Sequence, residues 1–349
     1  MRNRVGPLLI HGPMHSDVYG FFRNKCRREI DTSVFLYEHT ALFQGTPMTQ
    51  KQSIVLNAYS DLNESLVKIN QAAIDSIEIP GSGLCLMPSG LGSKWHGRPA
   101  QAIAFFIALN SLNYMFWSIA SINGKKAVSR YTYDGAQGAA GMRIAFDKAW
   151  GDSIHPGNFR KEPITREWVL ARFGNIPDPE SRAALLAEVF EGERLEAVSS
   201  DILQLIQSTK AISADQAELM RKAFPRAFGD PYLKRAQLAI FWIAGFLSEC
   251  GVTVDTTDVT AFADYQVPRA LRALGILEYS DELASKVDSL ALLDAGSMEE
   301  RAIRSASIVA CEALALAKGS TAGQVDNFLW TNRNIAGPVP FHLTFTENY

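Results

Sequence analysis

Cysteine and metal-binding patterns are scarce in this sequence. The 349 residues contain four cysteines, and none belongs to a CxxC pair. They are Cys26, Cys85, Cys250 and Cys311. Isolated cysteines are typical of free thiols in a reducing compartment, and they argue against a disulfide framework. The six histidines show no helical ligand spacing, because Gly12 and Pro13 separate His11 from His15. We therefore expect no metal site.

The chain also lacks an excess of positive charge and a clear membrane segment. Its formal net charge is −3, whereas proteins that bind the phosphate backbone usually present a concentrated basic surface. The longest apolar run, AQAIAFFIALNSLNYMFWSIA (100–120), contains two asparagines and two serines, which favour a buried core helix over a membrane span. The N-terminus does not resemble a signal peptide. We expect a cytoplasmic protein that binds neither nucleic acid nor membrane.

General catalytic motifs are missing as well. No Walker loop, GxSxG elbow, HExxH pair or strand-linked GxGxxG occurs, so we expect no cofactor. The glycines of GSGLCLMPSGLGSKWHGRP (81–99) are better explained by a surface loop than by phosphate binding. Neither a repeat nor a Gly/Ser/Pro linker divides the chain. These features predict a single composite domain over residues 1–349.

Helical periodicity dominates what remains. Apolar residues recur at intervals of three and four in segments 56–77, 100–120, 179–195, 201–212, 215–224, 234–250 and 299–317. Strand signals are few: KKAVSRYTYDGAQ (125–137) alternates and contains Asp134-Gly135, so it predicts a small hairpin or a strand before the next helix. The expected fold class is mainly α with a minor β element.

Asp264, in AFADYQVPRA (261–270), is the most unusual carboxylate. If Pro268 opens a helix, Gln266 or Val267 should cap it, and Asp264 lies too far upstream to do so. A preceding helix over 258–265 would place Asp264 in its last turn, where the dipole disfavours a carboxylate by roughly 0.3–1 kcal/mol. An unfavourable placement beside aromatic residues indicates a function.

Residues 268–288 predict two short helices joined by a tight turn. Gly275 suits a left-handed cap after the first helix, and Ser280 or Asp281 suits the N-cap of the second. Such a unit can present backbone amides to a phosphate, although the pattern is common.

Four further residues have both ordinary and functional interpretations. Asp326 could cap a helix beginning at Asn327, or could recognise a cationic ligand. His96 could be an ordinary loop residue or a ligand contact. Lys234 and Arg235 could form a solvated first turn or could bind an anion.

Four sequence blocks, in order, carry a family resemblance. They are LNYMFWS (112–118), YLKRAQ (232–237), FADYQVPRALRALGILEYSDEL (262–283) and VDNFLW (325–330). These blocks resemble the queuosine salvage family, the queuosine 5'-phosphate N-glycosylases. The likeness covers roughly residues 90–342 and is faint over the first 80 or so positions.

The resemblance implies a mostly helical fold similar to helix-hairpin-helix DNA glycosylases. It also implies hydrolysis of queuosine 5'-phosphate to queuine and ribose 5-phosphate. By this resemblance Asp264 is the catalytic carboxylate, Phe262 stacks on the base, and Asp326 and His96 contact the substrate.

The sequence departs from the family pattern near its end. Asn327 replaces a usual tyrosine, and Thr331 replaces a usual acidic residue. The tail PFHLTFTENY keeps His342 without the family's arginines. By charge and position, Lys234, Arg235 and His342 are the candidate phosphate contacts.

The chemistry of the implied reaction agrees with these roles. Cleavage of an N-glycosidic bond develops positive charge on the ribose, which a carboxylate such as Asp264 can stabilise or attack. A 7-deazaguanine base has carbon in place of N7, so protonation there cannot assist its departure. Asp326 could pair with the amine of the base's side arm, and Phe262 could contribute roughly 1–3 kcal/mol of stacking. A nucleic-acid glycosylase and a non-catalytic nucleoside-binding protein are the alternative functions.

Overall fold

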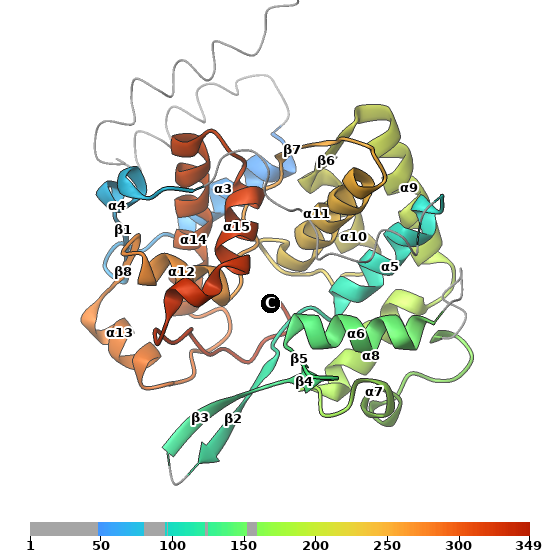
Figure 1. The fold of residues 1–349 in the computed structure, drawn as a ribbon, viewed down its shortest axis with the longest axis horizontal. Helices are drawn as coiled ribbons and strands as arrows, with labels where there is room; N and C mark the ends of the chain where they lie inside the picture. Colours follow the sequence, from blue (N-terminus) through green and yellow to red (C-terminus); the bar gives the residue numbers. More distant parts are fainter. Residues whose placement is uncertain (1–47, 80–94, 96, 123–124, 152–158) are drawn as a thin grey trace, which may run out of the picture. The chain divides into compact units, whose positions relative to one another are not determined.

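The computed structural model describes residues 48–79, 95, 97–122, 125–151 and 159–349. All of them belong to one compact unit, Pro47–Tyr349, and the chain's other unit is Met1–Thr46. The described fold is mainly α-helical with short two-stranded sheets, which confirms the expected class (Figure 1). Its likeness to helix-hairpin-helix glycosylases, and the single composite domain, stay predictions.

The helices follow one another through the whole described chain. They are α3 (Gln50–Asp61), α4 (Gln71–Ser76), α5 (Pro99–Ser111), α6 (Ala139–Trp150), α7 (Arg166–Phe173), α8 (Pro179–Phe190), α9 (Arg194–Thr209), α10 (Ala214–Ala223), α11 (Lys234–Glu249), α12 (Gln266–Ala273), α13 (Asp281–Asp288), α14 (Met298–Lys318), α15 (Ala322–Thr331) and the 3-10 helix η3 (Arg333–Ala336). Side chains cap several of these helices: Thr321 and Gln324 form a capping box at α15, and Ser297 accepts from Glu300 N at α14.

The strands pair in twos. Three pairs are antiparallel: β1 (Val67–Ile69) with β8 (Leu277–Tyr279), β2 (Trp117–Ile122) with β3 (Lys125–Arg130), and β4 (Thr132–Tyr133) with β5 (Ala136–Gln137). The pair β6 (Ala211–Ser213) with β7 (Asp255–Asp258) is parallel. Asp134-Gly135 forms the turn between β4 and β5, so the hairpin expected there is confirmed.

Two apolar regions form the core. One gathers α12, α14 and α15 with β1 and β8, and contains Leu271, Ile303 and Leu329. The other is an aromatic cluster in which the rings of Phe159 and Phe190 stack with centroids 4.3 Å apart. Burial on this scale explains why the helical periodicity of α11 and α14 was readable from the sequence.

The boundary expected at 195–201 is shifted, because α8 ends at Phe190 and α9 begins at Arg194. Three other expected helices differ more. Segment 56–77 contains the end of α3, strand β1 and helix α4 in place of one helix. In segment 100–120, α5 ends at Ser111 and the chain continues as a loop and strand β2. Segment 258–265 is not helical: β7 ends at Asp258, and residues 259–264 form no regular structure. In all three, pairing or contacts with distant residues overrode the local periodicity.

The two short helices expected over 268–288 are confirmed, whereas the tight turn expected between them is wrong, because residues 274–280 separate them. Helix α12 ends at Ala273, Gly275 has φ +70°, and Ser280 caps α13 by accepting a hydrogen bond from Leu283 N. Strand β8 lies between the two helices. No helix within the described ranges is both long and apolar enough to cross a bilayer.

Candidate active site

A cavity of about 200 Å³ is lined by residues from α11, α12, α15 and several loops. This volume exceeds the roughly 150 Å³ of an engineered cavity that holds benzene. Six of the expected site residues line it: Lys234, Phe262, Asp264, Asp326, Asn327 and Thr331. Residues that lie up to about one hundred positions apart in the sequence are thus brought together.

Asp264 lies at the N-terminus of α12. Its Oδ1 accepts hydrogen bonds from Gln266 N at 2.7 Å and Val267 N at 2.9 Å. The expectation that Asp264 cannot cap this helix was therefore wrong, because α12 begins at Gln266, two residues earlier than a start at Pro268. The dipole of α12 favours the ionised carboxylate, the opposite of the sign expected from a preceding helix. Within the described chain, Oδ2 of Asp264 takes part in no hydrogen bond.

Asp326 lies within α15 and does not cap a helix, contrary to its ordinary interpretation, because Thr321 already caps α15. Its Oδ2 accepts a hydrogen bond from Phe262 N at 2.9 Å. Burial raises the pKa of Asp326 well above its ordinary value, and the nearby Asp264 raises it further. A buried carboxylate held this way can exchange a proton or pair with a cation.

Lys234 is the cation that lowers the pKa of both carboxylates. Its side chain is buried, and Nζ donates to the carbonyl of Asn113 at 3.0 Å. Burial lowers the pKa of Lys234 to about 8, although Asp264 and Asp326 oppose that shift. Burial also raises the pKa of Asp264, and Lys234 is the strongest influence in the opposite direction. We call Asp264, Asp326 and Lys234 the carboxylate centre.

Aromatic side chains form much of the cavity lining. They are Tyr114, Phe116, Trp117, Trp242, Phe262, Tyr265, Trp330, Phe341 and Tyr349. Phe262 is buried, and Phe241 packs edge-on against its ring with centroids 5.3 Å apart. Thr331 directs its hydroxyl to the carbonyls of Asn327 and Phe328, so this hydroxyl is engaged within α15. The lining suits a flat, largely apolar ring system.

Two arginines, Arg130 at the end of β3 and Arg333 in η3, also line the cavity. We call them the arginine pair. Burial lowers the pKa of Arg333, and the charge of Arg130 lowers it further, while the charge of Asp264 opposes the shift. Arg333 is therefore affected by both the other arginine and the carboxylate centre. Arg333 donates to the carbonyl of Trp330 at 3.1 Å. Neither arginine has a carboxylate within ion-pair distance among the described residues.

Two of the expected contacts do not line the cavity, and a third is not placed. His96 is outside the described residues. Arg235 is buried, but it does not line the cavity: it donates to the carbonyl of Ser111 and lies 5.2 Å from the Tyr114 ring centroid. His342 is buried beside Tyr349, with Nε2 and the Tyr349 hydroxyl 3.0 Å apart, and burial lowers its pKa to about 3. The solvated first turn considered for Lys234 and Arg235 is wrong, since both side chains are buried.

Some cavity residues were missed from the sequence although a signal was present. Leu238 and Trp242 follow Lys234 at intervals of four, which places all three on one face of α11. Trp330 follows Asp326 by the same interval on α15. Helical spacing from the two motif residues could have found these neighbours.

The fold and the cavity together define the class of this protein. Buried carboxylates with shifted pKa values, beside a lysine and within an aromatic cavity, are typical of an enzyme site for a small ring-containing ligand. The sequence model of the family described as queuosine salvage protein matches residues 94–349. The chain therefore belongs to the queuosine salvage protein family.

Relatives from distant organisms agree with this assignment. A queuosine 5'-phosphate N-glycosylase/hydrolase of Sphaerobacter thermophilus is 32% identical over 277 residues, which cover 72% of this chain and 83% of that protein. Proteins of the same name from Mus musculus and Dictyostelium discoideum are 28% and 26% identical. Those alignments cover 71% and 70% of this chain, and 82% and 77% of the relatives. The resemblance drawn from the four sequence blocks is confirmed.

Proposed function

We propose that this protein hydrolyses the N-glycosidic bond of queuosine 5'-phosphate and releases queuine and ribose 5-phosphate. The observation that carries the proposal is the carboxylate centre, with Asp264 and Asp326 buried at one aromatic cavity. The names of the relatives supply the substrate. The reaction consumes one water molecule, whose oxygen ends on the anomeric carbon of the sugar.

Asp264 is the proposed reacting carboxylate. Its two backbone hydrogen bonds hold Oδ1, while Oδ2 is left without one among the described residues. A carboxylate fixed by one oxygen keeps the other available for the positive charge that develops on the ribose. This arrangement serves either electrostatic stabilisation or direct attack on the anomeric carbon, since both need a fixed, ionised oxygen.

Asp326 and Phe262 are the proposed base contacts. Asp326 holds Phe262 in place by accepting a hydrogen bond from the backbone NH of Phe262, so the stacking ring and the carboxylate form one unit. A cationic amine on the base that approached Asp326 would lower the pKa of this buried carboxyl and form a charge-assisted hydrogen bond. Asn327 and Thr331, one turn of α15 apart, are the proposed neighbours of the same base.

The arginine pair is the proposed phosphate contact. Arg130 and Arg333 line the cavity, and neither forms an ion pair with a described carboxylate, although the charge of Asp264 favours the charged form of Arg333. Two cations that raise each other's energy favour a bound dianion. Of the three phosphate contacts expected from the sequence, only Lys234 lines the cavity. Its ammonium donates to the carbonyl of Asn113 and interacts with the charges of Asp264 and Asp326.

Cys250 and Cys311 are both free thiols, which supports a reducing compartment such as the cytoplasm. Incubation of the purified protein with queuosine 5'-phosphate in ¹⁸O-labelled water tests the function. We expect queuine and singly labelled ribose 5-phosphate by mass spectrometry, and no release from Asp264→Ala. A wild-type protein that binds the nucleotide and releases no base over long incubation would instead support a binding protein.

A further inference from the structure

The segment that carries Asp264 has no secondary structure of its own to hold it. Residues 259–264 lie between β7 and α12, outside any helix or strand. Side chains from three helices bind this backbone instead: Gln237 accepts from Thr260 N, Asp326 accepts from Phe262 N, and Arg304 donates to the carbonyl of Ala263. The position of Asp264 therefore depends on these side chains.

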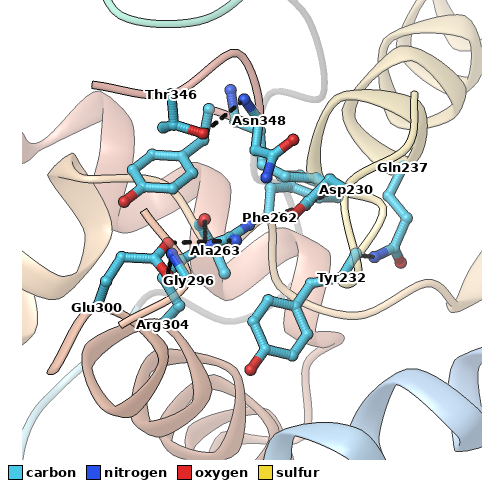
Figure 2. A network of polar contacts seen from close by, with 12 residues as sticks. Asp230, Tyr232, Gln237, Phe262, Ala263, Gly296, Glu300, Arg304, Thr346 and Asn348 are labelled. Atoms are coloured by element: carbon cyan, nitrogen blue, oxygen red, sulfur yellow. Dashed lines mark hydrogen bonds and ion pairs between the residues drawn. The ribbon is translucent and has the colours of Figure 1, made fainter. Parts of the chain in front are cut away.

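Arg304, on α14, makes the last of these contacts, next to Asp264 in the chain. Its Nε lies 3.0 Å from the oxygen of Ala263. Its other nitrogens lie 2.8 Å from Asp230 and 3.5 Å from Glu300, and only 2% of the residue is exposed. Figure 2 shows Arg304 in a network of polar contacts with Asp230 and Glu300 among its members. Burial lowers the pKa of Arg304, but these carboxylates raise it more, so the guanidinium stays charged.

The same guanidinium reaches two other cavity residues. The Tyr349 ring centroid lies 4.4 Å from it, and Tyr349 lines the cavity. Asp230 Oδ2, which accepts from Arg304, also accepts from Lys234 N at 2.8 Å at the start of α11. One side chain thus links the backbone of Asp264, the backbone of Lys234 and the ring of Tyr349.

We propose that Arg304 is a positioning residue that fixes Asp264 relative to Lys234 and Tyr349. The proposal rests on Asp264 being the reacting carboxylate. Arg304 does not line the cavity, so it acts on the reaction only through the residues it holds. A displacement of about 1 Å in a reacting group can lower a rate by about 10²-fold.

Two variants test the proposal by steady-state kinetics. Arg304→Lys keeps the charge but cannot reach Ala263, Asp230 and Glu300 together, and Arg304→Met removes the charge. We expect kcat to fall by about 10²-fold in both, with KM changed by less than about threefold. Tyr232→Phe is the matched control: it loses a hydrogen bond to Asp61 while keeping its ring at Arg304, so stability should fall with kcat unchanged.

A double-mutant cycle separates positioning from loss of folded protein. In an Asp264→Asn background, Arg304→Lys should lower the residual rate by less than about twofold, because the group it positions is gone. Equal losses in both backgrounds, or an unchanged kcat in folded Arg304→Lys, would overturn the inference. If the wild-type protein releases no base, the proposed function fails. Crystal structures of wild type and Arg304→Lys then test the inference separately. A displaced Asp264 carboxylate in the variant would support it, and an unmoved one would overturn it.

Discussion

The carboxylate centre and the arginine pair line the same cavity, yet they hold their charges differently. Asp264, Asp326 and Lys234 are 6%, 3% and 4% exposed, and backbone groups bind each of them. Arg130 is exposed and Arg333 is half-buried. One group is buried and held by backbone groups, whereas the other is more exposed to solvent.

This difference separates two uses of charge. In a buried, fixed site an electrostatic interaction is strong and needs little reorganisation during the reaction, so it suits bond cleavage. Accessible charges are screened by salt and attract a ligand without fixing it closely. The carboxylate centre should therefore determine kcat, and the arginine pair should determine KM.

The largest expected effect is at Asp264. Asp264→Asn keeps an oxygen that can accept from Gln266 and Val267, but it removes the charge that stabilises the ribose cation. We expect kcat to fall by about 10³-fold with the fold preserved. Release of queuine measures the rate, and circular dichroism checks the fold. A loss smaller than about tenfold would remove Asp264 from the reaction.

Asp326→Asn should have the next largest effect. The amide oxygen can still accept from Phe262 N, while the charged partner for the base is lost. We expect kcat/KM to fall by roughly 10- to 100-fold.

The same change should make the empty protein more stable. Burial and Asp264 raise the pKa of Asp326, so its ionised form opposes folding at neutral pH. We expect a gain of about 1 kcal/mol, or roughly 2 °C in Tm by calorimetry. Unchanged kinetics with a higher Tm would show that Asp326 has only the backbone of Phe262 as its partner.

Arg333→Met tests the other side of the comparison. Because Arg333 is half-buried and lowers the pKa of Asp264 less than Lys234 does, KM should rise by about tenfold while kcat stays within about twofold. The effect should shrink in high salt, and it should be absent with the unphosphorylated nucleoside. A fall in kcat with the nucleoside would place Arg333 in the carboxylate centre instead.

The smallest expected effect is an alkaline decline in kcat. The pKa of Lys234 is about 8, so above that pH the ammonium becomes neutral and no longer favours the ionised Asp264. Asp264 stays mostly ionised at such pH, and the decline to pH 9.5 should be less than about tenfold. A folded Lys234→Arg variant stays charged throughout and should show no decline.

The sequence predicted the elements that burial alone defines. Helices α11 and α14 carry long apolar faces, and their periodicity gave them directly. The region before α12 was misread because residues 259–264 are held by side chains of Gln237, Arg304 and Asp326, and such contacts leave no local pattern.

The candidate site was also predictable in part: residues within sequence motifs were found, and residues brought in by the tertiary fold were not. Phe262, Asp264 and Asp326 came from motif blocks, and the structure places all three at the cavity. Arg130 and Tyr349 come from a hairpin and from the last residue of the chain, and only the tertiary fold brings them together. His342 and Arg235 were chosen by charge, but burial directs them to other partners.

The hydrogen bonds of Asp264 give the protein an internal reporter. The amides of Gln266 and Val267 share one carboxylate oxygen, so any change in its electron density alters both of their NMR frequencies together. Protonation, pairing with a sugar cation and ester formation withdraw density to different degrees. The amide peaks of these two neighbouring residues, in a spectrum of the labelled protein, can therefore distinguish a carboxylate that attacks the sugar from one that only stabilises it.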